Sequence, residues 1–476
     1  MGKLKYLSKN IMLFSISNFV SKILVFLLVP FYTNVLSTYE YGVADVIQVT
    51  LLLLVPMITV NVGEAALRFG IEETDKRNSI FKVGIKYIVR ASIIVCFICF
   101  ALRGAAPMLP IIAGRADEIK LYLLLSIFLF AANAFYEFLV LFFQGCEEVE
   151  TIVIGSITCT MTTIGFNLIF LLGLKIGLRG YIYSQILAFA LSGILMLLIG
   201  KKNGLVLQAV IDSDIEERML AYSKPMIVYS TAAWVNNAVD RYFVLYMCGA
   251  AVNGVYGVAY KIPAILMVFQ RIFAQAWQLS ATKVHKDEDS DEFYSDMYKA
   301  YNCFMVLGCA VLILLLKPVA AFLFRKDFFV AWKLVSPLLI SVVFGALTGF
   351  LGSICLAHKD SKSMGRATAI GALINVILNL IMIPVLSSMG AALATGISYF
   401  VMFALALYFV KKHVKLEAPY IINICTYVLL VIEAVIMIKE VKYSYFICAV
   451  ICVLILFAYV KELKRIIEIL ISKIKR

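Results

Sequence analysis

The sequence is poor in charged residues and in histidine. Asp, Glu, Lys and Arg account for only 15% of its 476 residues, whereas 63% of the residues are hydrophobic. A soluble domain of this length could not cover its surface with so few polar groups, so the composition predicts a membrane protein with many spans. The three histidines, His285, His358 and His413, are not clustered along the chain, which argues against a metal site built on histidine.

Several motifs that indicate pumps, metal proteins or enzymes are missing. No glycine-rich phosphate-binding loop is present, which excludes an ATP-driven pump within this chain. The acidic run from Asp287 to Glu292 resembles a calcium loop, but Glu292 stands where such a loop requires glycine. Cys96 and Cys99 form a C-x-x-C inside an apolar segment, without a second pair, and this indicates packing. We therefore expect no cofactor and no metal. Since no outer loop is large enough to hold a glycosyl-transfer site, we also expect no enzyme activity.

The excess of basic residues points to membrane topology. The formal net charge is +13, but Lys and Arg lie in short loops, and aromatic residues do not interleave with them as in a nucleic-acid reader. Basic residues are concentrated in the loops on the side that carries both chain ends. The positive-inside rule therefore predicts that both termini lie in the cytoplasm.

Apolar runs of about 18–25 residues, the length that spans a bilayer as a helix, recur about fourteen times. They lie near residues 11–33, 42–63, 82–103, 120–143, 152–173, 181–200, 222–247, 254–277, 299–316, 333–356, 366–386, 390–410, 420–438 and 443–460. The sequence thus predicts an all-α polytopic membrane protein.

An internal repeat divides these spans. Residues 8–48 align without a gap on residues 223–263, and the block Tyr41–Ala44 falls on Tyr256–Ala259. Repeated sets of helices are common in transporters, with the substrate site between the halves; a chance likeness of apolar helices is the alternative. The predicted organisation comprises two six-helix lobes, a linker, two further helices and a tail. Their ranges are 1–200 and 221–410 for the lobes, 201–220 for the cytoplasmic linker, 411–460 for the two helices and 461–476 for the tail. The tail is expected to lie on the membrane as an amphipathic basic helix, or simply to fix topology.

Polar residues inside the apolar runs predict a site. A charge at the bilayer centre costs about 2.5–3.5 kcal/mol on insertion scales, so such residues usually face a bundle interior or a watery cavity. The candidate cavity residues are Asn18, Lys22, Asp45, Arg68, Asn237, Asp240, Arg241, Tyr256, Lys261 and Arg271. Their excess of positive charge suits a phosphate. The alternative is a set of ion pairs that only fix packing, especially Asp240 with Arg241 or Lys261.

Glu137 is a separate candidate. With Asn133 and Gln144 it forms a polar stripe on one helix face, and a carboxylate there can exchange a proton or hold a cation. We therefore predict an ion-coupling role, with a hydrogen-bonded packing carboxyl as the alternative. Pro30, Pro56 and Pro263 predict bends in the first, second and eighth spans.

Three groups of residues resemble a known family. They are Pro30–Leu36 followed by Glu40-Tyr41-Gly42; Asp240-Arg241 followed by Gly254-Val255-Tyr256 and Ala259-Tyr260-Lys261; and Asn375, Asn379 and Pro384 followed by Gly390–Thr395. In this order and spacing the chain resembles the polysaccharide transporters. These are the Wzx-type flippases for O-antigen, capsule or teichoic acid, within the multidrug/oligosaccharidyl-lipid/polysaccharide (MOP) exporter superfamily.

This resemblance implies fourteen helices in two lobes and alternating-access transport of an undecaprenyl-diphosphate-linked oligosaccharide for cell-surface polysaccharide biosynthesis. It also implies membrane lipids and polysaccharide-assembly proteins as partners. Lys22, Arg241, Lys261 and Arg271 would receive the diphosphate or acidic sugars, and Asn18, Asn237 and Tyr256 would bond to sugar hydroxyls. The alternatives are a cation-coupled multidrug exporter of the same fold, a membrane polysaccharide polymerase and a scaffold for glycan assembly. A polymerase would need a large outer loop, which the chain lacks.

Overall fold

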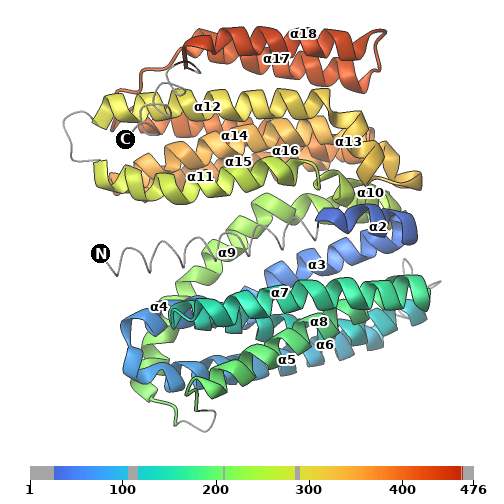
Figure 1. Cartoon of the computed structure of the whole chain (residues 1–476), viewed down its shortest axis with the longest axis vertical. Coiled ribbons are helices and arrows are strands. Elements are labelled where there is room, and N and C mark those ends of the chain that lie inside the picture. The colour runs from blue at the N-terminus through green and yellow to red at the C-terminus, as the bar shows by residue number, and fades with distance from the viewer. Residues whose placement is uncertain (1–25, 106–115, 207–209, 285–289, 463, 465–476) are drawn as a thin grey trace. The chain divides into compact units, whose positions relative to one another are not determined.

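The computed structural model describes residues 26–105, 116–206, 210–284, 290–462 and 464. These residues form helices and no strand, which confirms the all-α prediction (Figure 1). The chain divides into two compact units, residues 1–237 and 238–476, and the division lies inside one helix. The expected lobe, linker and tail boundaries stay predictions.

The helices of unit 1 follow one another through short connections. They are α2 (Val29–Val35), α3 (Thr38–Ile58), α4 (Val62–Glu72), η1 (Thr74–Lys76), α5 (Arg77–Ala105), α6 (Ala116–Gly145), α7 (Val149–Asn167), the π-helical η4 (Leu168–Gly173), α8 (Gly177–Lys202) and most of α9 (Ser213–Cys248). Helices α5, α6, α7 and α8 lie side by side (Figure 1).

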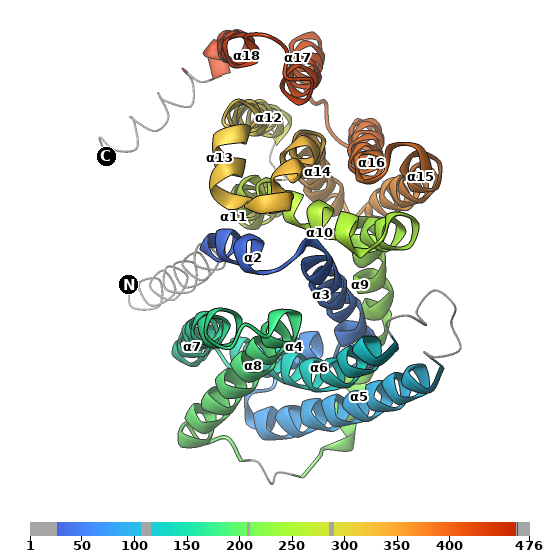
Figure 2. The same cartoon turned by 90° about the vertical axis from the view of Figure 1, so that its right-hand side faces the viewer.

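Unit 2 contains the end of α9 and all later helices. They are α10 (Ala250–Ala259), α11 (Pro263–Val284), α12 (Ser290–Leu314), α13 (Leu316–Leu323), η5 (Lys326–Ala331), α14 (Trp332–Ala357), α15 (Ser361–Leu386), α16 (Ser388–Val410), α17 (Tyr420–Ile438) and α18 (Ser444–Ala458). Helices α17 and α18 form a hairpin, seen end-on in Figure 2.

Ten of the described helices are long and apolar enough to cross a membrane, or up to eleven if the bent pair α10 and α11 is one span. The expected number of fourteen stays a prediction, because the first expected span lies mainly in residues 1–25, outside the described part. The last, α18, has 15 residues, short for a span of about 20.

Close contact between helices builds the core of unit 1. Phe138 of α6 stacks on Phe142, and Phe142 packs against Phe81 of α5, with ring centroids 5.9 and 5.3 Å apart. All three rings are buried. The Phe138 ring fits because it faces Gly84: a Cβ at this glycine would lie 2.0 Å from a ring carbon. Small residues at such points let membrane helices approach one another closely. Close packing matters because lipid tails are as apolar as the side chains, so the hydrophobic effect does not drive the helices together.

Helix α14 is the centre of unit 2. It packs against α11, α12, α16 and α17 and is buried on nearly every side, as expected for a helix that is apolar all round. Phe350 of α14 stacks on Trp277 of α11 with a centroid separation of 4.1 Å, and the indole nitrogen donates to the Phe350 carbonyl at 3.1 Å.

The hairpin of α17 and α18 is held to α12 by buried polar side chains. The Asn302 amide nitrogen donates to Asn423 Oδ1 and to the Tyr459 hydroxyl at 3.0 and 2.8 Å, and its oxygen accepts from Tyr427 at 2.6 Å. A network of this kind specifies one pairing of helices that would otherwise be interchangeable apolar rods.

Two of the expected bends are present. Helix α3 ends two residues after Pro56, and the chain turns through Val60 and Asn61, which have positive φ angles of 56° and 52°. Helices α10 and α11 meet at an angle of 49° directly before Pro263. Pro30 lies in the first turn of the short helix α2, where its missing amide costs nothing.

Glu40 ties two helix starts together. Its carboxylate accepts from the backbone nitrogen of Ser37 in a capping box on α3 and, at 3.0 Å, from the backbone nitrogen of Leu178 at the start of α8. Nearby, the Asn167 amide donates to the Tyr32 hydroxyl at 2.9 Å. These contacts explain structurally why Tyr32 and Glu40 belong to the first resembling motif.

The polar start of α9 is fastened to unit 1 by charges. Lys86 of α5 donates to both carboxylate oxygens of Glu216 at 2.6 and 2.7 Å, and Lys76 lies 2.8 Å from Asp212. Arg218 pairs with Glu73 at 2.7 Å. The ammonium of Lys86 holds the pKa of the Glu216 carboxyl below its ordinary value of 4.5.

The replacement Gly177→Ala should destabilise the protein by more than 1 kcal/mol. Gly177 has a φ of 58°, and an added Cβ would lie 2.2 Å from Glu40 Oε1, so the change adds backbone strain and a clash. Thermal unfolding of the detergent-solubilised protein measures this effect. The control Gly165→Ala, where a Cβ meets no atom within 4 Å, should be neutral or stabilising, and equal midpoints for both variants would contradict the argument.

Acidification should loosen the start of α9. Because the folded-state pKa of Glu216 is lowered, its stabilising contribution is fully present above pH 4.5 and is lost as the pH falls through the folded-state value. The hydrogen-exchange protection factors of residues 210–220, which are corrected for the intrinsic exchange rate at each pH, should therefore fall below pH 4.5. In a Lys86→Met variant the same segment should exchange faster at neutral pH; no difference from wild type there would contradict a role for this pair.

Candidate functional site

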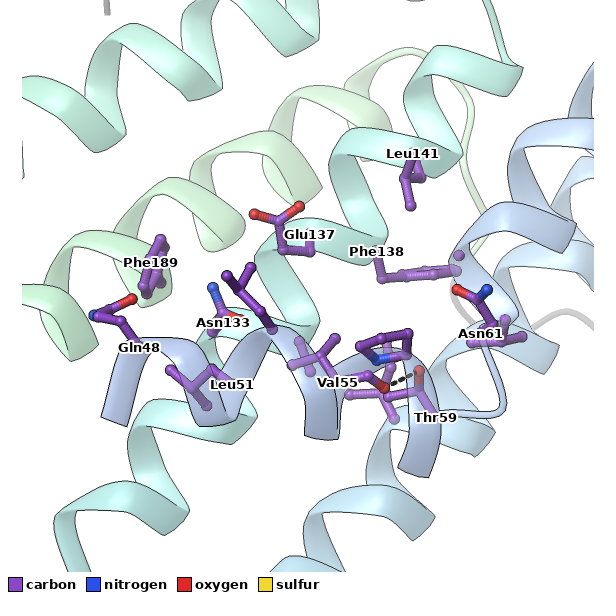
Figure 3. A pocket seen from close by; sticks show the side chains of 16 residues that line it. Gln48, Leu51, Val55, Thr59, Asn61, Asn133, Glu137, Phe138, Leu141 and Phe189 are labelled. Atoms are coloured by element: carbon purple, nitrogen blue, oxygen red, sulfur yellow. Dashed lines mark hydrogen bonds between the residues drawn. The ribbon is translucent and has the colours of Figure 1, made fainter. Parts of the chain in front are cut away.

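A pocket of about 340 Å³ lies within unit 1, and its lining residues come from α3, α4, α5, α6, α8 and the turn between α3 and α4. Figure 3 shows Gln48 and Phe189 at one end, Asn133 and Glu137 in the middle and Asn61 at the other end. Most other lining side chains are apolar. An apolar cavity with a few convergent polar groups is the usual form of a ligand site.

Glu137 is the single ionisable residue among the 16 that line this pocket. It is exposed although it lies within the apolar helix α6. Neither Glu137 nor Asn133, one helical turn earlier, has a side-chain hydrogen bond or ion pair with any described residue. The ion-coupling role of Glu137 and its packing alternative both stay predictions. Gln144, the third member of the expected stripe, is not among the lining residues.

The break between α3 and α4 supplies the polar end of the pocket. Thr59 donates its hydroxyl hydrogen to the Val55 carbonyl at 2.6 Å, which leaves the hydroxyl oxygen able to accept. The Asn61 amide nitrogen donates to Ser230 at 3.2 Å, which leaves the amide oxygen as an acceptor. A continuous helix would not turn these two groups to the same cavity.

A second polar cluster lies in unit 2 around Asp240 of α9. The carboxylate is 4% exposed, and it accepts from the hydroxyls of Tyr256 and Tyr260 at 2.5 and 2.7 Å and from Thr395 at 3.3 Å. Its other oxygen accepts from the backbone nitrogen of Arg241 at 2.9 Å. Three hydroxyl donors and an amide thus replace the water that a buried carboxylate loses.

The cluster extends into α15. The Asn375 amide lies 3.5 Å from Thr395 Oγ1 and accepts from Asn379 at 2.9 Å. The oxygen of Asn379 is buried without a hydrogen-bond partner among the described residues. Oxygen atoms of these types are ligands for hard cations. No group of three or more His, Cys, Asp and Glu in the described residues could hold a metal ion.

The structure brings some expected cavity residues together and leaves others apart. Asp240, Arg241 and Tyr256 meet in the cluster, and the Arg241 guanidinium lies 4.8 Å from the centre of the Tyr260 ring. Lys261 lies in the bend between α10 and α11. Arg271 of α11 is exposed and forms no ion pair with a described residue.

The remaining expected residues belong to unit 1. Arg68 is half-exposed and paired with Glu72 at 3.1 Å, and Asp45 is partly buried on α3. Asn237 lies in α9. Asn18 and Lys22 lie outside the described residues. The cavity lined by both halves therefore stays a prediction.

Sequence reasoning missed Tyr260 and Thr395 as partners of Asp240, and Asn375 as a partner of Thr395. A signal was available, since Tyr256 and Tyr260, like Asn375 and Asn379, are four residues apart on one helix face. It also missed the acceptors at Thr59 and Asn61, because no pattern placed the end of α3 beside Glu137.

The fold was compared with solved structures. The lipid II flippase MurJ in an inward closed conformation matches with a TM-score of 0.69 and 18% identity, covering 96% of this chain and 99% of that one. An inward-facing multidrug resistance MATE family transporter of the MOP superfamily also has a TM-score of 0.69, with 13% identity and coverage of 82% and 94%. The chain thus has the polytopic helical fold of MOP transporters.

A match to a protein-family model identifies the family of the chain. Residues 7–279 match the model of the polysaccharide biosynthesis protein family, which is more than half of the chain, and the chain belongs to this family. No curated protein matches it. The expected resemblance is confirmed, and the chain combines membership of this family with the multi-pass helical fold seen in the flippase MurJ and the MATE transporter.

The replacement Tyr256→Phe should destabilise unit 2 by about 1–3 kcal/mol, because it removes a donor to a buried carboxylate. Thermal unfolding in detergent checks this value. The matched control Tyr246→Phe, at a tyrosine that is 80% exposed, should leave the midpoint unchanged. An equal shift in both variants would show that the hydroxyl of Tyr256 has no special role.

Proposed function

We propose that the protein is a flippase that moves an undecaprenyl-diphosphate-linked oligosaccharide across the bacterial cytoplasmic membrane by alternating access, with both termini in the cytoplasm. The family match and the likeness of the fold to lipid II flippase MurJ support this proposal. The observation that carries it is Arg271, an exposed guanidinium in the apolar helix α11 without an ion-pair partner among the described residues.

An unpaired arginine is costly in a membrane helix. The cost of about 2.5–3.5 kcal/mol on insertion scales is normally met only where a function requires the charge. A guanidinium binds phosphate oxygens through two parallel hydrogen bonds, so a diphosphate carrier is a ligand that matches this group. In this proposal Lys22, Arg241 and Lys261 share the role, while Asn18, Asn237 and Tyr256 contact sugar hydroxyls. Asp45, Arg68 and Asp240 complete the cavity.

The broken helices suit alternating access. A helix pair that meets at 49°, as α10 and α11 do, can change its angle without losing hydrogen bonds inside either half. Broken helices at the binding site are a general feature of transporters. We assign the two moving halves to residues 1–200 and 221–410, joined by the linker 201–220.

The replacement Arg271→Gln should lower translocation about tenfold, because a hydrogen bond to a charged group contributes about 1.5–3 kcal/mol. Lys22→Gln should act in the same direction. The assay follows a lipid-linked oligosaccharide across proteoliposome membranes, at equal protein incorporation. The control is Arg366→Gln, at an exposed arginine in the second turn of α15, and it should retain the wild-type rate. Unchanged rates for both Arg271→Gln and Lys22→Gln would contradict the proposed diphosphate contact.

A cation-coupled multidrug exporter is the second candidate, and one observation favours it. The unit 1 pocket contains a lone carboxylate together with Phe138 and Phe189, which suits an apolar organic cation. Transport of a cationic dye by proteoliposomes that fail to move the lipid-linked oligosaccharide would favour this candidate. In such an exporter Glu137 is the candidate ion-coupling residue.

A further inference from the structure

We propose that the unit 1 pocket binds a sugar ring that carries a protonated amine, as one residue of the transported glycan. This inference rests on the proposed flippase function and names a chemical feature of its substrate. It depends on three properties of the pocket: its charge, its polar lining and its size.

The charge of the pocket selects a cation. Glu137 is the single ionisable residue of the lining, and its carboxylate has no hydrogen bond or ion pair with a described residue. Among the described residues, no lysine, arginine or histidine lines the pocket to attract a phosphate or an acidic sugar. A carboxylate in an apolar span without a partner is expensive, and an ammonium group that binds there would offset this cost through a charge-assisted hydrogen bond.

The uncharged polar groups favour a sugar over an apolar cation. Gln48, Thr59, Asn61 and Asn133 line the same cavity, and Asn133 has no side-chain hydrogen bond with a described residue. An apolar ammonium ligand would displace water from the pocket without pairing the Asn133 amide, and a buried polar group left without a partner costs about 1–3 kcal/mol. The hydroxyls of a sugar ring would instead bond to the amides and to the Thr59 oxygen.

The size of the pocket leaves room for a ligand much larger than a bare ion. A cavity of about 340 Å³ is roughly ten times the volume of one water molecule in the liquid, about 30 Å³. It is at the lower end of the usual range for small-molecule sites, which suits one monosaccharide unit. Phe189, at the same end as Gln48 (Figure 3), offers a flat apolar face for the C–H side of the ring.

The test measures binding of monosaccharides to the full-length protein in detergent, by ligand-observed NMR, at a pH at which the amine is protonated. Glucosamine should bind at least about tenfold more tightly than glucose or N-acetylglucosamine, which have the same ring without the charge. The replacement Glu137→Gln should abolish this preference, whereas Glu118→Gln, at an exposed glutamate in the first turn of the same helix, should keep it. Asn133→Ala should weaken the binding of all three sugars.

Several results would overturn the inference. They are equal binding of glucosamine and glucose to the wild-type protein, a preference that survives in Glu137→Gln, and tighter binding of an apolar ammonium such as benzylamine. Stabilisation through Glu137 by sodium or protons without any sugar binding would assign the pocket to ion coupling instead. Because the wild-type comparison of three sugars needs no variant, poor folding of Glu137→Gln would not prevent the test.

Failure of this inference is separable from failure of the flippase proposal. Translocation of a lipid-linked oligosaccharide that contains only neutral and acidic sugars would leave the flippase proposal standing. If glucosamine then shows no preference for the pocket, only the assignment of the unit 1 pocket falls.

Discussion

Buried charge in an apolar surrounding is the constraint on which both units depend. Water is absent from the hydrocarbon core of a bilayer, so a polar group at that depth needs a partner within the chain, in a ligand or in a water-filled cavity. Asp240 meets this requirement with three hydroxyls and a backbone amide. Glu137 does not meet it within the described residues. The first carboxylate therefore has its partners within the chain, whereas in our proposal the second obtains its partner from a ligand.

The same constraint explains how apolar helices choose their neighbours. Leucine and phenylalanine are as compatible with lipid as with another helix, so burial alone does not select a pairing. Selection comes from shape, as where Gly84 admits the ring of Phe138. It also comes from buried polar groups, as where Asn302 joins α12 to α17 and to Tyr459, which follows α18. Glu40 does the same for the starts of α3 and α8.

Much of the fold follows from the sequence because the physics involved is local. The lengths of the apolar runs indicate most of the helices, and Pro56 and Pro263 indicate where two of them break. The stripe of Asn133 and Glu137 indicates that one face of α6 is special. Periodicity identifies one side of a helix, but it does not indicate which other helix that side contacts. For this reason Tyr260 and Thr395 were not foreseen beside Asp240. The available indication was the four-residue spacing of Tyr256 and Tyr260.

Helix α9 connects the two units of the chain. Its first turns are fastened to unit 1 by Lys86 and Glu73, and its far end carries Asp240 into the hydroxyl cluster of unit 2. Because α9 is one helix across the division at Asn237, a change in the orientation of either unit must be transmitted along it as bending or torsion. Pro225 lies between the two anchors and lacks the amide hydrogen that would stiffen the helix there. Between its two anchored ends, α9 thus lacks one of its backbone hydrogen bonds at Pro225.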